Sequence, residues 1–218
     1  MSLFDKAKKK KEVETKDVST LGWDAIVQVC EKIYPNQKDP KHYGTLVSWR
    51  LGGNDPLDGI SIYDGGDYWH FVTFGLSELY EKESKNQEIS GYGMEFTLKL
   101  KKGYSDDEES EIKGICGILQ TLARITFQKG EVFGPYEYIY TGQKQGVDIK
   151  QTSMLTGFIT VVDNDLKTTM TPNGQVTFVE LIGATDKELL AVHNHQLTVE
   201  ELYQKIGDIT DYQRESVI

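Results

Sequence analysis

Residues 91–100 read Gly-Tyr-Gly-Met-Glu-Phe-Thr-Leu-Lys-Leu, in which large apolar residues alternate strictly with small or polar ones. The polar or small set is Gly93, Glu95, Thr97 and Lys99. Because successive side chains of a β-strand point to opposite faces, the pattern predicts a strand with one buried and one polar face. Such a strand is typical of an antiparallel sheet.

A β-hairpin is predicted directly upstream, from Gly59 to Phe74. Ile60 and Ile62 alternate with polar neighbours, and the residues from Tyr68 to Phe74 are largely apolar. The turn Asp64-Gly65-Gly66-Asp67 separates the two segments. A glycine pair between two apolar segments is a typical hairpin signal.

The other predicted elements follow from apolar periodicity and capping signals. One helix is capped by Ser19 and ended by Pro35, and a longer one runs from Ser105-Asp106-Asp107-Glu108 to Lys129-Gly130. Further strands are predicted at 47–51, 155–162 and 175–182, and short helices at 76–82 and after Thr185 and Thr198. Residues 133–146 show no clear period.

This order of elements indicates an α+β fold with a largely antiparallel mixed sheet, or sheets, flanked by helices. The strands cluster in two groups separated by the long helix, so a single domain of two lobes is an open alternative. Residues 1–18 contain six Lys and four acids and few large apolar groups. We expect them to form a charged, partly disordered leader before one domain at 19–218.

The chain carries 34 Asp and Glu against 24 Lys and Arg, a net charge of −10, and only three basic residues are Arg. A phosphate-backbone binder needs clustered cations, so we expect no direct nucleic-acid binding. Residues 55–95 hold nine acids and two Lys. We expect an acidic partner-binding surface there, although a merely solvated face is the alternative. Its candidate residues are Asp55, Asp58, Asp64, Asp67, Tyr68, His70, Glu78 and Glu95.

The sequence lacks the phosphate-binding, dinucleotide-binding, zinc-protease, serine-hydrolase and Cys-x-x-Cys motifs. We therefore expect no catalytic residue, cofactor or metal, and keep a carboxylate-based hydrolase as the enzyme alternative. His70 lies in an apolar segment and is interpreted as a buried, hydrogen-bonded structural residue, with catalysis or switching as alternatives.

Cys30 and Cys116 lie at apolar helix positions and are predicted to be buried free thiols, which suits a reducing cytoplasm. No apolar run approaches 18 residues and no signal-peptide pattern is present, so we predict a cytoplasmic protein without membrane contact.

Three strings resemble the core of the suppressor-of-fused-like domain, in the same order and at similar spacing. They are Asp-Pro-Leu-Asp-Gly-Ile at 55–60, Trp-His-Phe-Val-Thr-Phe-Gly-Leu-Ser-Glu-Leu-Tyr at 69–80, and Gly-Tyr-Gly-Met-Glu-Phe-Thr-Leu at 91–98. Segments 178–185 and 208–210 resemble the C-terminal part of that domain, so the resemblance covers residues 21–210. Met94 and Lys99 stand where Leu and Arg are more usual in the family.

The resemblance implies an α+β domain that works by binding protein. In animals the namesake of the family sequesters a transcription factor, whereas single-domain bacterial members are similar to immunity proteins that neutralise a toxin, often a nuclease. The length leaves no room for the second domain of the animal protein, so we expect a bacterial immunity protein or antitoxin. Its acidic surface would mask a cognate protein toxin.

A regulatory module that captures an extended peptide as an added strand is the alternative function. No oligomeric state follows from the sequence.

Overall fold

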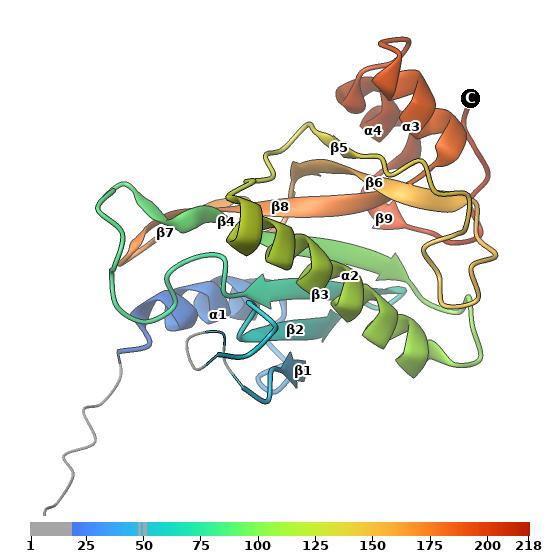
Figure 1. Cartoon of the computed structure of the whole chain (residues 1–218). Helices are drawn as coiled ribbons and strands as arrows, with labels where there is room; N and C mark the ends of the chain where they lie inside the picture. The colour runs from blue at the N-terminus through green and yellow to red at the C-terminus, as the bar shows by residue number, and fades with distance from the viewer. Residues whose placement is uncertain (1–18, 48, 50–51) are drawn as a thin grey trace, which may run out of the picture.

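The computed structural model describes residues 19–47, 49 and 52–218, so the predicted leader lies outside the described residues. In this part of the chain nine strands form one open sheet in the order β1-β2-β3-β4-β8-β6-β5, with β7 paired to β8 and β9 to β4 (Figure 1). The strands are β1 (Lys41–Gly44), β2 (Gly59–Asp64), β3 (Tyr68–Phe74), β4 (Ile89–Lys101), β5 (Tyr138–Ile139), β6 (Leu155–Val162), β7 (Thr168–Thr171), β8 (Gly174–Thr185) and β9 (Ile209–Thr210). Strand β4 pairs in parallel with β8 and β9, and the other pairings are antiparallel. The predicted α+β fold with a largely antiparallel sheet is confirmed.

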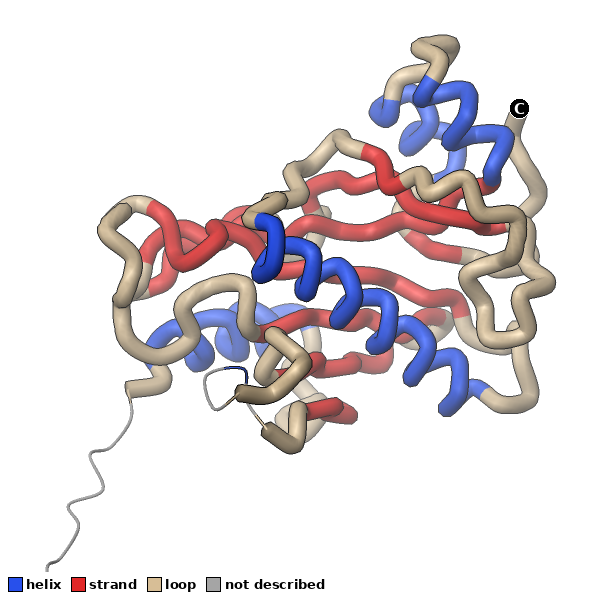
Figure 2. The backbone as a smooth tube through the Cα atoms, in the orientation of Figure 1, coloured by secondary structure: helices blue, strands red, loops and turns tan. Residues whose placement is uncertain are grey.

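Helices cover both faces of the sheet. Helix α2 (Glu108–Lys129) lies diagonally across one face, as Figure 2 shows most clearly. The other three helices are α1 (Leu21–Ile33), α3 (Asp186–His193) and α4 (Val199–Ile206). Residues of α1 pack with Phe74 and Phe178, and residues of α3 and α4 pack with Ile159 and Ile182. None of the helices in the described part of the chain is long and apolar enough to cross a bilayer.

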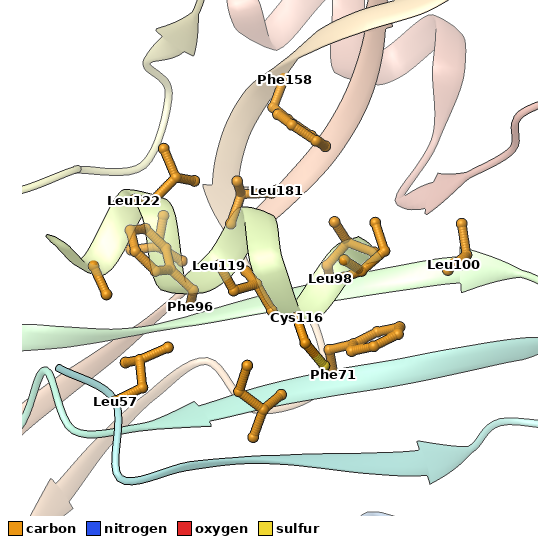
Figure 3. Packing of buried hydrophobic residues seen from close by; sticks show 14 of the residues in the cluster. Leu57, Phe71, Phe96, Leu98, Leu100, Cys116, Leu119, Leu122, Phe158 and Leu181 are labelled. Atoms are coloured by element: carbon orange, nitrogen blue, oxygen red, sulfur yellow. The ribbon is translucent and has the colours of Figure 1, made fainter. Parts of the chain in front are cut away.

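The largest apolar cluster lies between α2 and the sheet. Figure 3 shows Leu119 and Leu122 of the helix facing Phe96 and Leu98 of β4 and Leu181 of β8. These side chains are almost completely buried. Burial of a side chain of this size contributes about 1.5–3 kcal/mol, so this cluster fixes α2 on the sheet.

The hairpin of β2 and β3, the helices that follow Thr185 and Thr198, and the two buried free cysteines are all confirmed. Burial raises the pKa of both thiols to about 12. Both capping boxes form, because each threonine accepts from the backbone of a glutamate whose side chain accepts in return.

The predicted polar face of the strand at 92–100 is wrong, because β4 is buried on both faces from Met94 to Leu100. Thr97 and Lys99 are 0% and 1% exposed. These polar side chains are tolerated there because each binds polar groups from other parts of the chain, as described below.

Four other local predictions are wrong. Residues 76–82 form an irregular loop instead of a helix. Val47 lies in a bend and Trp49 in a 3₁₀ turn, not in a strand, while residues 48 and 50–51 lie outside the described residues. Helix α1 follows Thr20 instead of Ser19, and α2 is capped by Asp107, whose carboxylate accepts from Ser110 N at 3.1 Å.

Candidate functional site

The end of β3 and the start of the loop at 75–88 are built around the buried carboxylate of Glu95 on β4. The backbone N–H groups of Gly75, Leu76 and Ser77 donate to Glu95 Oε1 at 2.9–3.1 Å. The hydroxyls of Ser77 and Thr73 donate to Oε1 and Oε2 at 2.7 Å. Burial raises the pKa of Glu95, and these donors oppose that shift. One carboxylate thus holds three successive backbone N–H groups at the start of this loop.

Glu78 anchors the second half of the same loop. Its carboxylate accepts from Glu83 N at 2.7 Å, from Gly91 N at 3.1 Å and from Lys82 Nζ at 2.8 Å. Burial alone would raise the pKa of Glu78, but Lys82 and the backbone donors, including Ser84 N, lower it to about 2. The loop at 75–88 is therefore fixed at both ends by buried acids.

A cavity of about 480 Å³ lies between this loop and the C-terminal end of α2. Among the described residues, its aromatic lining comes from four parts of the chain, and its charged lining is acidic. The aromatic set is Trp49, Tyr80, Tyr92 and Phe127, and the acidic set is Asp58, Glu78 and Glu83. Two further cavities, of about 660 and 450 Å³, lie along α2.

A buried polar cluster lies on the opposite face of the sheet, beside α1. His70 Nδ1 is 2.8 Å from the hydroxyl of Tyr34, and its Nε2 is 3.0 Å from Asp163 Oδ2. Thr97 donates to the same Asp163 oxygen at 2.8 Å. Burial opposes ionisation of Asp163, but His70 and Lys99 hold its pKa well below the usual range. His70 is 0% exposed, which confirms that it is a buried, hydrogen-bonded histidine.

Lys99 is the cation at the centre of this cluster. Its Nζ lies 3.0 Å from Asp165, 3.1 Å from Asp208 and 3.4 Å from Glu180. Glu180 is 0% exposed, and its carboxylate oxygens accept no hydrogen bond from the described residues. Burial, and then the charge of Asp163, raise the pKa of Glu180 well above its usual value. Carboxylates thus outnumber the lysine that neutralises them.

The predicted acidic surface at 55–95 carries mixed charge around the hairpin. Asp55 pairs with Arg124 at 2.5 Å, and Asp64 pairs with Lys102. The ammonium groups of Lys41 and Lys102 also lie over the ring of Trp69, 4.7 and 3.9 Å from its centroid. These cations offset much of the charge that we expected a partner to meet.

The eight predicted site residues lie in three places. Asp58 and Glu78 line the 480 Å³ cavity. Asp55, Asp64, Asp67 and Tyr68 lie at the surface or are half-buried. His70 and Glu95 are 0% exposed and cannot form part of a contact surface, which corrects that part of the expectation.

Sequence reasoning did not assign the cavity residues Tyr80, Tyr92 and Phe127 or the buried acids Asp163 and Glu180 to a site. Helical and strand periodicity marks such aromatic residues only as core. Across residues 19–47, 49 and 52–218, no group of three or more His, Cys, Asp or Glu side chains is arranged to hold a metal ion.

A family model described as suppressor of fused protein (SUFU) matches residues 53–215. The human and mouse proteins called suppressor of fused homolog are each 29% identical to the chain over 181 residues. The match covers 77% of this chain and 36% of each relative, so the chain spans little more than a third of their length.

Two solved structures are similar over most of the chain. A crystal structure of the Sufu-Fu complex has a TM-score of 0.76 and 28% identity, covering 90% of this chain and 92% of the other. Drosophila Suppressor of Fused also has a TM-score of 0.76 and 28% identity, covering 91% of this chain and 52% of the other.

Proposed function

The chain belongs to the suppressor of fused family, and on this basis we propose that it is a protein-binding module that neutralises a cognate toxin of cationic surface, as a bacterial immunity protein does. Binding of protein is supported by the relative whose structure is the Sufu-Fu complex. The observation that carries the choice of partner is the net charge of −10. A nuclease presents cations to its substrate, and an acidic protein that covers them gains fast, steered association.

We place the contact surface on the loop at 75–88 and not on the hairpin turn. The turn acid Asp64 is paired with Lys102, whereas Glu81 and Glu88 of the loop are exposed. The loop is also rigid because Glu95 and Glu78 hold it. A preformed surface loses less conformational entropy on binding than a mobile one.

The test is capture of the product of the neighbouring reading frame by the purified chain, at about 0.1 M and about 0.5 M salt. We expect capture at the lower salt and its loss at the higher, together with rescue of growth when the two are expressed together. The double charge reversal Glu81→Lys, Glu88→Lys should weaken capture more than Asp67→Lys in the hairpin turn. Capture that is indifferent to salt and to both variants contradicts the proposal.

A second candidate function is capture of an extended peptide by a regulatory module. It is favoured by the open ends of the sheet, where β1 and β5 are the outermost strands. Edge strands offer unpaired backbone groups to an added strand. A co-crystal structure with a peptide paired to β1 or β5 would favour this function over the masking of a toxin.

The geometry does not favour the hydrolase alternative, because His70 and its neighbour Asp163 are both 0% exposed and out of reach of a substrate.

The free thiols of Cys30 and Cys116 support a cytoplasmic location, which we also propose. We further propose that residues 19–218 act as one domain.

A further inference from the structure

The cavity of about 480 Å³ beside the loop at 75–88 has the lining of a site for an organic cation. The ring centroids of Trp49 and Phe127 are 5.4 Å apart in an edge-to-face arrangement, and those of Tyr92 and Phe127 are 5.2 Å apart. Tyr80 completes the aromatic set. Aromatic faces carry negative potential and attract ammonium and guanidinium groups, most strongly when water is excluded.

Two acidic residues of the cavity, Glu78 and Asp58, differ in whether their carboxylates are already engaged within the described part of the chain. Glu78 is engaged with Lys82 and with backbone donors of its own loop. Asp58 is half-buried at the cavity, and its carboxylate forms no ion pair with any residue in the described part of the chain. A carboxylate beside aromatic rings supplies the counter-charge that a bound cation needs.

The cavity is preformed. A side chain at Gly75 would place its Cβ 2.9 Å from Leu57 Cα, and one at Gly91 would place it 2.7 Å from Leu76 O. Both residues have positive φ, which glycine adopts without strain. The backbone on this side of the cavity is therefore tightly packed, and the carboxylates of Glu95 and Glu78 hold it at Gly75 and at Gly91. A fixed wall loses little entropy when a ligand enters.

We propose that this cavity binds an arginine side chain of the protein partner, with the guanidinium stacked on the aromatic rings and hydrogen-bonded to Asp58. Arginine suits the site better than lysine because its planar group stacks on rings and binds a carboxylate through two donors. The volume of about 480 Å³ falls within the range of roughly 300–1,000 Å³ that ligand cavities span. The inference rests on the proposed protein-binding function, and it specifies the chemistry by which the partner is recognised.

The test is a titration of the full ¹⁵N-labelled chain with the tripeptide acetyl-Ala-Arg-Ala-amide, followed by NMR. The matched probe replaces arginine with citrulline, which keeps the shape and removes the charge. We expect saturable shifts at residues 75–80, Tyr92 and Phe127, and binding of the citrulline peptide at least about tenfold weaker.

Asp58→Asn should weaken binding of the arginine peptide by about tenfold, while Asp67→Asn, an exposed acid outside the cavity, should leave it unchanged. The unfolding midpoint of each variant shows that it is folded, and the citrulline comparison on the unaltered chain needs no variant. Equal binding of the two peptides, shifts confined to other surfaces, or an unchanged Asp58→Asn each overturn the inference.

The same titration separates this inference from the proposed function. If the chain captures its partner but the arginine peptide does not bind, the cavity inference fails and the protein-binding function stands. If the peptide binds as described but no partner is captured, the cavity is a cation site and the toxin proposal fails.

Discussion

Both carboxylate oxygens of Glu95 accept hydrogen bonds, from five donors in residues 73–77. A glutamine at this position has one oxygen and an NH₂ group that cannot accept. Glu95→Gln should therefore leave at least one buried donor unpaired and lower the free energy of unfolding by about 2–4 kcal/mol, measured by urea denaturation. The control is Glu88→Gln, at an exposed acid directly before the same strand, and it should be neutral within about 0.5 kcal/mol. Equal effects of the two substitutions would contradict the role of Glu95.

Glu180 makes stability depend on pH. Its pKa in the folded protein lies well above the ordinary value of 4.5, while the groups facing it are Lys99, Asp163 and Asp208. As pH rises above 4.5 the unfolded chain releases this proton before the folded protein does, so stability falls until the folded pKa is passed. Each pKa unit of difference corresponds to about 1.4 kcal/mol.

We expect Glu180→Gln to gain stability relative to the unaltered chain as pH rises from about 4.5 to about 8, because glutamine does not titrate. Urea denaturation of both proteins at several pH values measures the difference. Two parallel stability curves would show that Glu180 keeps the same protonation in the folded and unfolded states.

At the scale of elements, α1 is held against the loop by contact at Gly22. Gly22 lies in the first turn of α1. A Cβ at this residue would lie 2.1 Å from Glu78 O and 3.0 Å from Leu79 Cα, both of which are backbone atoms. Gly117, in α2, has no atom within 4 Å of the same position. Both glycines are helical, but only Gly22 has close neighbours, so Gly117 is a matched control for a substitution at Gly22.

Gly22→Ala should destabilise the protein by about 1–3 kcal/mol, because α1 must move away from the loop. Gly117→Ala should stabilise it by about 0.5–1 kcal/mol, because alanine favours the helix and meets no neighbour. Thermal unfolding of the two variants measures both signs. A stabilising Gly22→Ala would mean that α1 does not pack tightly on the loop.

Elements with a regular pattern were predictable from the sequence, and those set by distant contacts were not. The hairpin at 59–74 and the helices after Thr185 and Thr198 depend on neighbouring residues, so periodicity and capping signals locate them. The loop at 76–82 has apolar residues at helical spacing, but distant donors take the carbonyl groups that a helix would use: Leu76 O accepts from Tyr92 N, and Leu79 O accepts from Trp23 N. His70 and Asp163 are 93 residues apart, and no local pattern joins them.

The candidate site was predictable in the same limited way. The excess of acids at 55–95 marked the region, and Asp58 and Glu78 do line the cavity. The alternation along β4 sets the face on which Glu95 lies, but other parts of the fold that cover this face decide whether it is buried, so the burial of Glu95 did not follow from the alternation. The aromatic lining comes from Trp49, Tyr92 and Phe127, which only the packing of α2 on β4 brings together.

For the whole molecule, the net charge of −10 and the position of its acids decide what kind of partner fits. Buried acids such as Glu95, Asp163 and Glu180 belong to the interior. Asp64 of the hairpin turn is paired with Lys102, and Asp55 before the hairpin is paired with Arg124. The exposed acids that remain around the cavity give a surface that attracts cations over a distance set by the salt concentration.

The most direct test of the account is the association rate of the chain with the captured partner, measured by stopped flow at increasing salt. An acidic contact surface predicts that the rate constant falls by at least about tenfold between roughly 0.05 and 0.5 M salt, with a much smaller change in the dissociation rate. A rate constant that stays the same over this range would contradict recognition of a cationic partner.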